Sequence, residues 1–322
     1  MKLSIIIVSW NVCEDVLRCL ESIYSCPPSE SYEIILVDNA SADDTVPCVH
    51  ERFPEVKLIE NAENLGFAAA NNRGLEKAAA EYVFFLNPDT IVLPDALDKL
   101  IVFMGQHPEI GLCGPQILNP DYSIQRSVRR FPTFKAIASR FTILKYLRLF
   151  REDFHRWTMR DFDHKERITA DQLMGAAIMA RADIIRKIKS FDERFFMYYE
   201  EVDLCYRVKK IGLEVVFFPE SAIIHLGGSS AKQIPAKVKF MVLKSLVLFM
   251  HKHHGGMRVK IYLMLFKLGV FTRQFFEMVL YSFAFLFSFY WPSFGKKNYL
   301  RVKSSFLFLV KYYIRLLVTR YQ

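Results

Sequence analysis

The chain has 322 residues, of which 52% are hydrophobic, and its formal net charge is +9. This length holds one large or two modest domains, and the apolar content excludes a disordered chain. From Lys232 onward the chain carries 16 lysines and arginines but one acid, Glu277, which leaves 27 basic and 33 acidic residues before that point. An acidic first part and a basic second part indicate two functions in one chain. The basic part is expected to bind either anionic lipid or nucleic acid.

The apolar run at residues 3–10 is too short for a signal peptide, because the polar residues Asn11, Glu14 and Asp15 follow it. Its composition is typical of a strand covered on both faces. The six cysteines form no CxxC pair and no metal-ligand cluster. We therefore expect reduced, mostly buried thiols in a cytosolic setting.

Strands and helices are expected to alternate over the first 225 residues. The predicted strands are residues 3–10, 32–37, 56–59, 82–86 and 110–118, with a strand and helix in 172–190 and one or two strands in 213–225. The other predicted helices begin at or just after Asn11, Ser41, Gly66, Pro94 and Glu200. Asn11 is expected to cap the first helix, with Glu14 as its capping-box partner. This alternation predicts a mostly parallel α/β sheet in a catalytic domain of residues 1–231, in which residues 120–168 allow no assignment.

Two acidic residues follow predicted strands directly. Asp38 ends the strand at 32–37, and Asp89 lies just beyond the strand at 82–86. Ligands of open α/β sheets bind beyond the carboxyl ends of the strands. The sequence therefore predicts that Asp38 and Asp89 lie at the ligand-binding edge of the sheet.

The remainder, residues 232–322, is expected to be a basic, Phe-rich helical region that associates with a membrane surface. Lys237, Lys244 and His251 recur every seven residues among apolar ones, as in a helix at a lipid headgroup boundary. Residues 278–295 carry no charge, which is at the lower limit for a spanning helix. An interfacial or re-entrant segment is favoured over a span and over a soluble partner-binding bundle. Nucleic acid is disfavoured, because the charges alternate with long apolar side chains rather than with exposed stacking platforms.

Six segments together resemble one family. They are SIIIVSWN, VDNAS, NLGFAAANNRG, FLNPDT, FDERFFMYYEEVDLCYR and HLGGSS, in this order over residues 1–230. The chain thereby resembles the family-2 glycosyltransferases of the GT-A fold, and within them the bacterial rhamnosyltransferase-like enzymes of surface-polysaccharide assembly. The segments are weak evidence singly and specific in combination.

The resemblance implies an inverting transfer from a nucleotide sugar, with L-rhamnose on deoxythymidine diphosphate as the favoured donor. The implied acceptor is a saccharide or a polyprenyl-diphosphate-linked saccharide, the implied cofactor is Mg²⁺ or Mn²⁺, and the implied location is the cytoplasmic face of the inner membrane, peripheral or monotopic. Two alternatives stay open. A nucleotidyltransferase would require a basic, glycine-rich loop that Ser9-Trp10-Asn11 does not offer, and a non-catalytic, membrane-bound nucleotide-sugar binder would have no turnover.

The resemblance assigns the metal to Asp89 and His225. The family's Asp-x-Asp motif reads Asn87-Pro88-Asp89 here, so its first acid is absent. Oxygen ligands suit a hard divalent cation, and a neutral imidazole completes such a shell. The alternatives are a helix-capping role for Asp89 and a structural role for His225.

The resemblance also places the nucleotide sugar against eight residues: Asp38, Asn39, Asn64, Gly66, Asn71, Asn87, Asp89 and Arg129. For Asp38 an Asx turn with Ser41 is the alternative. Arg129, with Arg126 and Arg130, is expected either to meet a phosphate of donor or acceptor, or to belong to a solvated loop.

The catalytic base is assigned to Glu201, with Glu200 as the second candidate. Glu200-Glu201 stands where the family has a Glu-Asp pair whose second member takes the proton from the acceptor hydroxyl. Acids in the first turn of a helix are also favoured by the helix dipole alone.

Overall fold

A computed structural model of the chain describes residues 1–227, 235–286 and 292–318. The chain divides into two compact units. The sheet unit comprises Met1–Phe131 and Asp161–Ser230, and the helical unit comprises Pro132–Arg160 and Ala231–Gln322. The sequence-based division at 231/232 had placed 132–160 with the sheet. These residues join the helical unit because their rings pack on its longest helix: Phe141 contacts Phe266 edge-on, and the Tyr262 hydroxyl donates to the carbonyl of Phe134.

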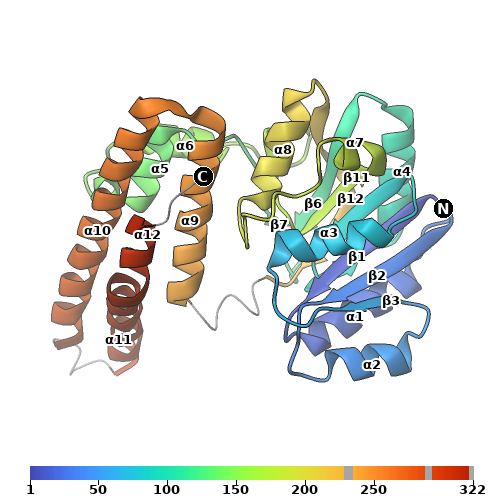
Figure 1. Cartoon of the computed structure of the whole chain (residues 1–322), viewed down its shortest axis with the longest axis horizontal. Coiled ribbons are helices and arrows are strands. Elements are labelled where there is room, and N and C mark those ends of the chain that lie inside the picture. Colours follow the sequence, from blue (N-terminus) through green and yellow to red (C-terminus); the bar gives the residue numbers. More distant parts are fainter. Residues whose placement is uncertain (228–234, 287–291, 319–322) are drawn as a thin grey trace. The chain divides into compact units, whose positions relative to one another are not determined.

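In the described residues the sheet unit contains a ten-stranded, mostly parallel sheet (Figure 1). The main strands run in the order β3-β2-β1-β4-β11-β6-β12-β5. Their bounds are β1 Leu3–Ser9, β2 Tyr32–Asp38, β3 Lys57–Glu60, β4 Tyr82–Leu86, β5 Thr90–Val92, β6 Ile110–Leu118, β11 Ala177–Arg181 and β12 Glu214–His225. β1 to β4 pair in parallel, β11 is antiparallel to both of its neighbours, and β7 (Ile124–Gln125) and β9 (Ile168–Thr169) pair with β6 and β12. The predicted α/β class is therefore confirmed.

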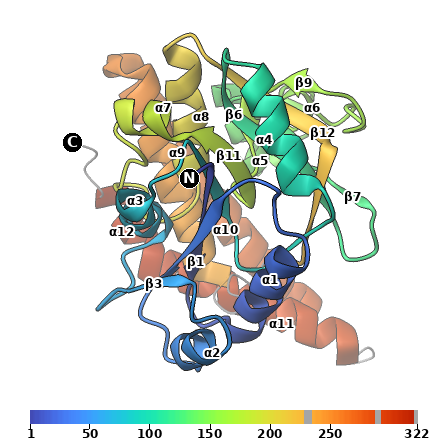
Figure 2. The same ribbon diagram turned by 90° about the vertical axis from the view of Figure 1, so that its right-hand side faces the viewer.

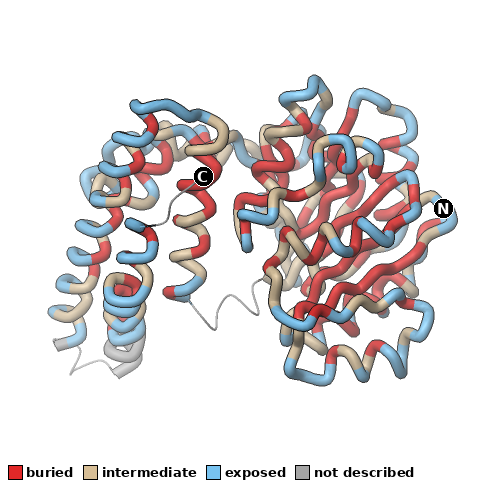
Figure 3. Tube along the Cα trace, in the orientation of Figure 1, coloured by how far each residue is buried: buried red, intermediate tan, exposed pale blue. Residues whose placement is uncertain are grey.

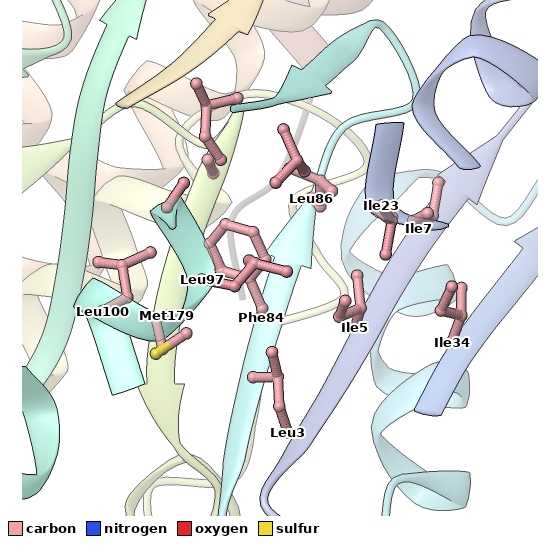
Figure 4. Close-up of a cluster of buried hydrophobic side chains, with 14 of the residues drawn as sticks. Leu3, Ile5, Ile7, Ile23, Ile34, Phe84, Leu86, Leu97, Leu100 and Met179 are labelled. Atoms are coloured by element: carbon pink, nitrogen blue, oxygen red, sulfur yellow. The ribbon is translucent and has the colours of Figure 1, made fainter. Parts of the chain in front are cut away.

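Helices cover both faces of this sheet, which explains the continuous apolar strands. Figure 2 shows α3 (Phe67–Lys77) on one side of β1, with α1 (Cys13–Ser25) and α4 (Ala96–Gln106) on the other. The α1 and α4 side holds the core cluster drawn in Figure 4, where Ile5, Phe84 and Leu97 lie side by side. On the α3 side a Cβ at Gly74 would lie 2.6 Å from Ile6, so the absence of a side chain there lets the helix approach the strand.

Two predicted helix starts are wrong for the same reason. α1 begins at Cys13 rather than being capped by Asn11, whose side chain instead accepts from the backbone N–H of Ala42. α2 (Thr45–Arg52) begins after Ser41, whose hydroxyl donates to Asp38 and accepts from the backbone N–H of Asn11. In both cases contacts between two loops replace the local cap that the sequence pattern favoured.

The helical unit is built from α5 (Phe134–Phe141), η1 (Ile143–Lys145), α6 (Arg151–Trp157), α9 (Pro235–His254), α10 (Gly256–Leu286), α11 (Pro292–Leu307), η4 (Phe308–Tyr313) and α12 (Ile314–Val318). Figure 3 shows buried and exposed positions alternating along α10, in contrast to the buried central strands of the sheet unit. Among the described residues, none of the helices combines the length and the apolar character that crossing a membrane requires. Part of the uncharged stretch 278–295, residues 287–291, lies outside the described residues, as does 228–230 of the HLGGSS segment.

Candidate active site

The candidate site lies where the parallel strands β1, β2 and β4 end side by side. Ser9 of β1 stands opposite Asp38 of β2, and Ile7 stands opposite Leu86 of β4, so the turn after β4 continues beside Ser9. β2 and β4 flank β1 on either side, which separates their ends by two strand spacings, about 10 Å. Asp38 and the 87–90 turn are therefore placed to meet different parts of one elongated ligand.

Asp38 is held firmly at this edge. Its Oδ1 accepts from the hydroxyls of Ser9 (3.0 Å) and Ser41 (2.5 Å), and its Oδ2 accepts from the Ser41 N–H (2.8 Å). Asp38 thus makes the local contact with Ser41 that the sequence allowed, through the N–H three residues on. A carboxylate has about four lone-pair sites, so it keeps acceptor capacity for a ligand hydroxyl.

Asn39 organises the loop that follows β3. Its amide donates to the carbonyl of Gly66 (3.1 Å), while its oxygen accepts from Asn61 Nδ2 (2.9 Å) and from the Leu65 N–H (3.2 Å). Asn64 Oδ1 in turn accepts from the Gly66 N–H at 2.9 Å. Asn39 and Asn64 therefore act on loop shape, whatever contact they also make with a ligand.

Position 66 requires a glycine, because the chain segment that contains Phe196 passes close to it. Its φ is +86°, and a Cβ built there would lie 2.4 Å from the carbonyl oxygen of Phe196. That same carbonyl accepts from the N–H of Phe67, the first residue of α3, at 2.7 Å. Asn71 lies one turn further along, buried, with its amide donating to the Phe67 carbonyl. The structure thus gives Asn71 a role within the helix and no exposed surface.

Asp89 and His225, which are 136 positions apart in the sequence, meet through β-pairing. His225 stands opposite Thr90 in the β12–β5 ladder, and its Nε2 lies 3.3 Å from Asp89 Oδ1. Gln125 donates through Nε2 to Asn119 Oδ1 (2.9 Å), so its Oε1 is the atom that faces His225 Nδ1, at 2.7 Å. This network assigns a proton to His225 Nδ1 and directs Nε2 at the Asp89 carboxylate.

Glu200 and Glu201 open α8 (Glu200–Lys210), after Tyr198 and Tyr199, both of which have φ of +68°. Two successive side-chain-bearing residues in the left-handed region are strained, a feature that concentrates at functional sites. Among the described residues the Oε2 atoms of both glutamates are buried without a hydrogen-bond partner. Burial first, and then the charge of Glu201, raise the pKa of Glu200 well above its ordinary value. Burial also raises the pKa of Glu201, against backbone hydrogen bonds and the positive charge of Arg129.

A buried ion pair fixes α8 in place. Asp203 is fully buried, and its Oδ2 accepts from Arg207 Nε at 2.7 Å. Arg207 also donates to the carbonyls of Ile188 and Ser190, both at 2.6 Å. The two glutamates thus stand on a helix whose position is set by charge-assisted bonds rather than by the glutamates themselves.

The acids of α8 and the turn after β4 are linked by residues 175 and 176. A Cβ at Gly175 would lie 3.5 Å from Glu201, and the next residue, Ala176, accepts from the N–H of Asn87 at 2.9 Å. Arg129, exposed on β8 (Val128–Arg129), acts on the charge of Glu201. These contacts connect Asn87, Glu201 and Arg129. In the same way a side-chain contact connects Asp89 with His225 and the loop hydrogen bonds connect Asn39 and Asn64 with Gly66, whereas the side chain of Asn71 is turned into its own helix.

A family model described as Glycosyl transferase family 2 matches residues 4–167, which is half of the chain. The chain belongs to glycosyltransferase family 2. The resemblance seen in the sequence is thereby confirmed.

Two curated relatives of this glycosyltransferase share most of its length. N-acetylglucosaminyl-diphospho-decaprenol L-rhamnosyltransferase of Mycobacterium tuberculosis is 27% identical over 278 residues, covering 79% of this chain and 85% of that protein. The amylovoran biosynthesis glycosyltransferase AmsE of Erwinia amylovora is 24% identical over 246 residues, covering 70% of this chain and 91% of the relative.

Solved structures show that this glycosyltransferase has the GT-A fold. Mannosyltransferase PcManGT from Pyrobaculum calidifontis, in complex with GDP-Man and Mn²⁺, superposes with a TM-score of 0.56 at 15% identity, covering 96% of this chain and 87% of that one. GalNAc-T7 with UDP, GalNAc and Mn²⁺ gives a TM-score of 0.55 at 16% identity; the match covers 77% of this chain but 47% of the GalNAc-T7 chain.

Sequence reasoning missed the residues of the glycosyltransferase that orient the candidates. Gln125 sets the tautomer of His225, Ser9 binds Asp38, and Asn61 holds Asn39. Ser9 lies at the end of the first strand and was readable from its position. Gln125 belongs to a two-residue strand within the unassigned 120–168 segment, so no periodicity could reveal it.

Proposed function

We propose that this glycosyltransferase transfers a sugar with inversion from a nucleotide sugar to a lipid-linked or saccharide acceptor during assembly of a bacterial surface polysaccharide. The observation that carries the proposal is the row formed by Asp38, the 87–90 turn and the α8 acids at one edge of the sheet. The names of the two curated relatives, one a rhamnosyltransferase and one a polysaccharide-biosynthesis enzyme, support it. The rhamnosyltransferase relative makes L-rhamnose on deoxythymidine diphosphate the first donor to test.

In the proposed reaction the acceptor oxygen forms a bond to the anomeric carbon while the bond from that carbon to the diphosphate oxygen breaks. Glu201 receives the hydroxyl proton, and the nucleoside diphosphate leaves with the electron pair of the broken bond. Asp38 receives hydrogen bonds from the nucleoside at one end of the row, and Asp89 faces the phosphates at the other. Single displacement from the face opposite the leaving group inverts the anomeric configuration.

Asp89 and His225 fit a divalent cation. With Nδ1–H committed to Gln125, two electron-pair donors, Asp89 Oδ1 and His225 Nε2, face each other at 3.3 Å, which favours a cation or a proton between them. The described residues offer no group of three or more His, Cys, Asp or Glu side chains for a metal. One carboxylate with one imidazole suits Mg²⁺ or Mn²⁺ that shares its coordination with substrate phosphates. Such a cation neutralises the charge that develops on the leaving diphosphate, and the Mn²⁺ bound in both solved structures named above agrees with this choice.

The helical unit supports association with an anionic membrane surface on the cytoplasmic side, by a peripheral or monotopic mode. Exposed large apolar side chains recur every three or four residues along α10: Met257, Ile261, Met264, Leu268, Phe271, Phe275, Val279 and Phe283. A continuous exposed apolar stripe on a basic segment suits burial at the headgroup boundary.

The enzymatic proposal is tested by incubating the full-length protein with a panel of nucleotide sugars, Mn²⁺ and a lipid-linked acceptor. We expect nucleoside diphosphate release with one donor above all others, with deoxythymidine diphosphate rhamnose first, and a product of inverted anomeric configuration. Release of pyrophosphate from a nucleoside triphosphate and a sugar phosphate would instead establish a nucleotidyltransferase. Donor binding without turnover across the panel would establish a non-catalytic binder.

Membrane association is tested by flotation with vesicles. We expect co-flotation with vesicles containing phosphatidylglycerol and a large loss with phosphatidylcholine alone, because basic residues near a surface contribute about 1 kcal/mol each. A Phe275→Ser, Phe283→Ser variant should float less well than a Lys57→Ser, Glu63→Ser variant of the sheet unit. Flotation indifferent to lipid charge and to the stripe would contradict the proposal.

A further inference from the structure

The helical unit contains a pocket of about 620 Å³ that the glycosyltransferase site does not use. Its wall comes from α5, η1, α6 and the segments around them, together with α9 and α10, so it lies within one compact unit. The segment 132–160 supplies one side, and the facing helices supply Lys239 and Arg273. This pocket is large enough for a phosphorylated headgroup of several heavy atoms.

The pocket is lined by cations. Five arginines and lysines of the 132–160 segment line it, namely Arg140, Lys145, Arg148, Arg151 and Arg160, in addition to Lys239 and Arg273. No acidic residue in the described part of the chain lines it. Glu277 lies behind the wall, where its Oε1 accepts from Arg273 Nε and from the Tyr146 hydroxyl, both at 2.8 Å. Glu152 is turned to Arg156 on the exposed side of α6, at 3.9 Å. Seven positive side chains thus face the pocket, and the negative charge of Glu277 neutralises only part of their charge.

Burial and, to a lesser degree, the neighbouring positive charges act on two lysines of the pocket. Burial lowers the pKa of Lys239 to about 8, with Arg273 and Lys145 adding to the shift and Glu277 opposing it. Partial burial, together with the charges of Arg273 and Arg140 and against that of Glu277, also lowers the pKa of Lys145. Groups that repel one another in this way gain most from an anion placed among them.

Exposed apolar side chains alternate in the sequence with cations that line the pocket, and this apolar border points to an amphiphile. Between the lining residues Lys145, Arg148 and Arg151 stand Leu147, which is 63% exposed, and Leu149, which is 46% exposed. Tyr146 continues this border, with its ring 5.3 Å from that of Phe276 on α10. A site for a free anion needs no exposed apolar border, whereas a phosphate carried on a hydrocarbon chain is complementary to both parts.

We propose that this cationic pocket binds the diphosphate group of an isoprenoid-linked acceptor, with the hydrocarbon lying along the apolar border formed by Tyr146, Leu147, Leu149 and Phe276. The inference rests on the proposed function for its choice of acceptor. The proposal also assigns a function to residues 132–160. This segment belongs to the helical unit and supplies five of the seven cations that line the pocket.

The test compares a Lys145→Gln, Arg151→Gln double variant with wild-type full-length protein in detergent, using farnesyl diphosphate and inorganic diphosphate as probes. Both side chains are exposed, so the substitutions spare the fold, and thermal unfolding checks this. We expect wild type to bind farnesyl diphosphate more tightly than inorganic diphosphate, and the double variant to lose about tenfold or more in affinity, as for the removal of charged hydrogen-bond donors. The matched control is Arg258→Gln, Lys260→Gln, which removes two exposed charges of α10 outside the pocket and should bind as wild type does.

An equal loss of affinity in the double variant and in the control would mean that the effect comes from overall charge alone. This result would overturn the proposal. Equal affinity of wild type for the two probes would make the pocket a site for free phosphate and overturn the isoprenoid part. In the transfer assay the double variant should raise the KM for an isoprenyl-diphosphate-linked acceptor while leaving the KM for the nucleotide sugar unchanged. If wild type turns over no nucleotide sugar, the proposed function fails, yet the binding comparison still decides the role of the pocket.

Discussion

Replacing Glu201 with glutamine is expected to reduce kcat for sugar transfer by about 10²–10⁴-fold, the usual contribution of a positioned general base. Glutamine keeps the size of the side chain and its contact with Gly175 but cannot accept the hydroxyl proton. The donor site at Asp38 and Gly66 is untouched, so the affinity for the nucleotide sugar should stay within a factor of a few. Steady-state kinetics and donor binding by calorimetry measure the two quantities separately.

The Glu200→Gln variant decides between the two candidate bases. Burial raises the pKa of both glutamates, and the charge of Glu201 adds to the shift at Glu200, so we expect a proton shared by the pair to reside on Glu200 and Glu201 to be the carboxylate. Glutamine at position 200 mimics that protonated form and should preserve most of the transfer rate. Glu76→Gln, an exposed change on α3, serves as the control. Full activity in Glu201→Gln together with a loss in Glu200→Gln would reverse the assignment.

The same pair sets the expected dependence on pH. A base must be unprotonated, so kcat/KM should fall as pH falls through the raised pKa of Glu201, at a higher pH than an ordinary glutamate would give.

The folding stability should depend on pH in the opposite direction and decrease as pH rises. Since the folded-state pKa of Glu200 is above its unfolded value, the stability it contributes is present below the unfolded pKa and is lost as pH rises through the folded pKa. Glu200→Gln should remove this loss, measured as a higher Tm than wild type at neutral pH.

The sheet was predictable because its strands carry their own signal. The runs at 32–37 and 82–86 appear in the structure as β2 and β4 because strands covered on both faces are apolar at nearly every position. The short strands β7 and β8 carry no such signal, since two residues show no periodicity. The helix starts failed at Asn11 and Ser41, where hydrogen bonds between these two distant loops decided the outcome.

The residue types of the site were predictable, but their environments were not. The pairing of β12 with β5 carries His225 to Asp89, a contact that required the family resemblance to suggest it. Glu201 packs close to Gly175, which is distant in the sequence, so the environment of the buried glutamates is not a local property of the helix. The cationic pocket was unreadable for a similar reason, because its residues are collected from segments that lie far apart in the chain.

Replacing Asp89 with asparagine is expected to lower kcat/KM by about 10²–10³-fold, comparable to the loss of one charged group that stabilises a developing negative charge. Asparagine keeps the shape of the turn and its backbone bond to the N–H of Leu226, but it supplies a neutral oxygen in place of a charged one. Mn²⁺ affinity, measured by electron paramagnetic resonance in the presence of nucleoside diphosphate, should fall in parallel, whereas the control Asp183→Asn, an exposed change on α7 (Ala182–Lys187), should alter neither quantity.

The His225→Gln variant tests whether His225 and Asp89 bind the same cation. If Asp89 and His225 hold one cation, both variants should weaken Mn²⁺ binding, and the double variant should lose little beyond the more damaging single one, because groups that act on one ion are not additive. Since Asn87 occupies the place of the motif's first acid, the 87–90 turn contains one carboxylate, and no neighbour in it can replace the lost charge. Unchanged Mn²⁺ affinity in Asp89→Asn would mean that Asp89 orients His225 instead, and the loss of rate would then persist at saturating metal.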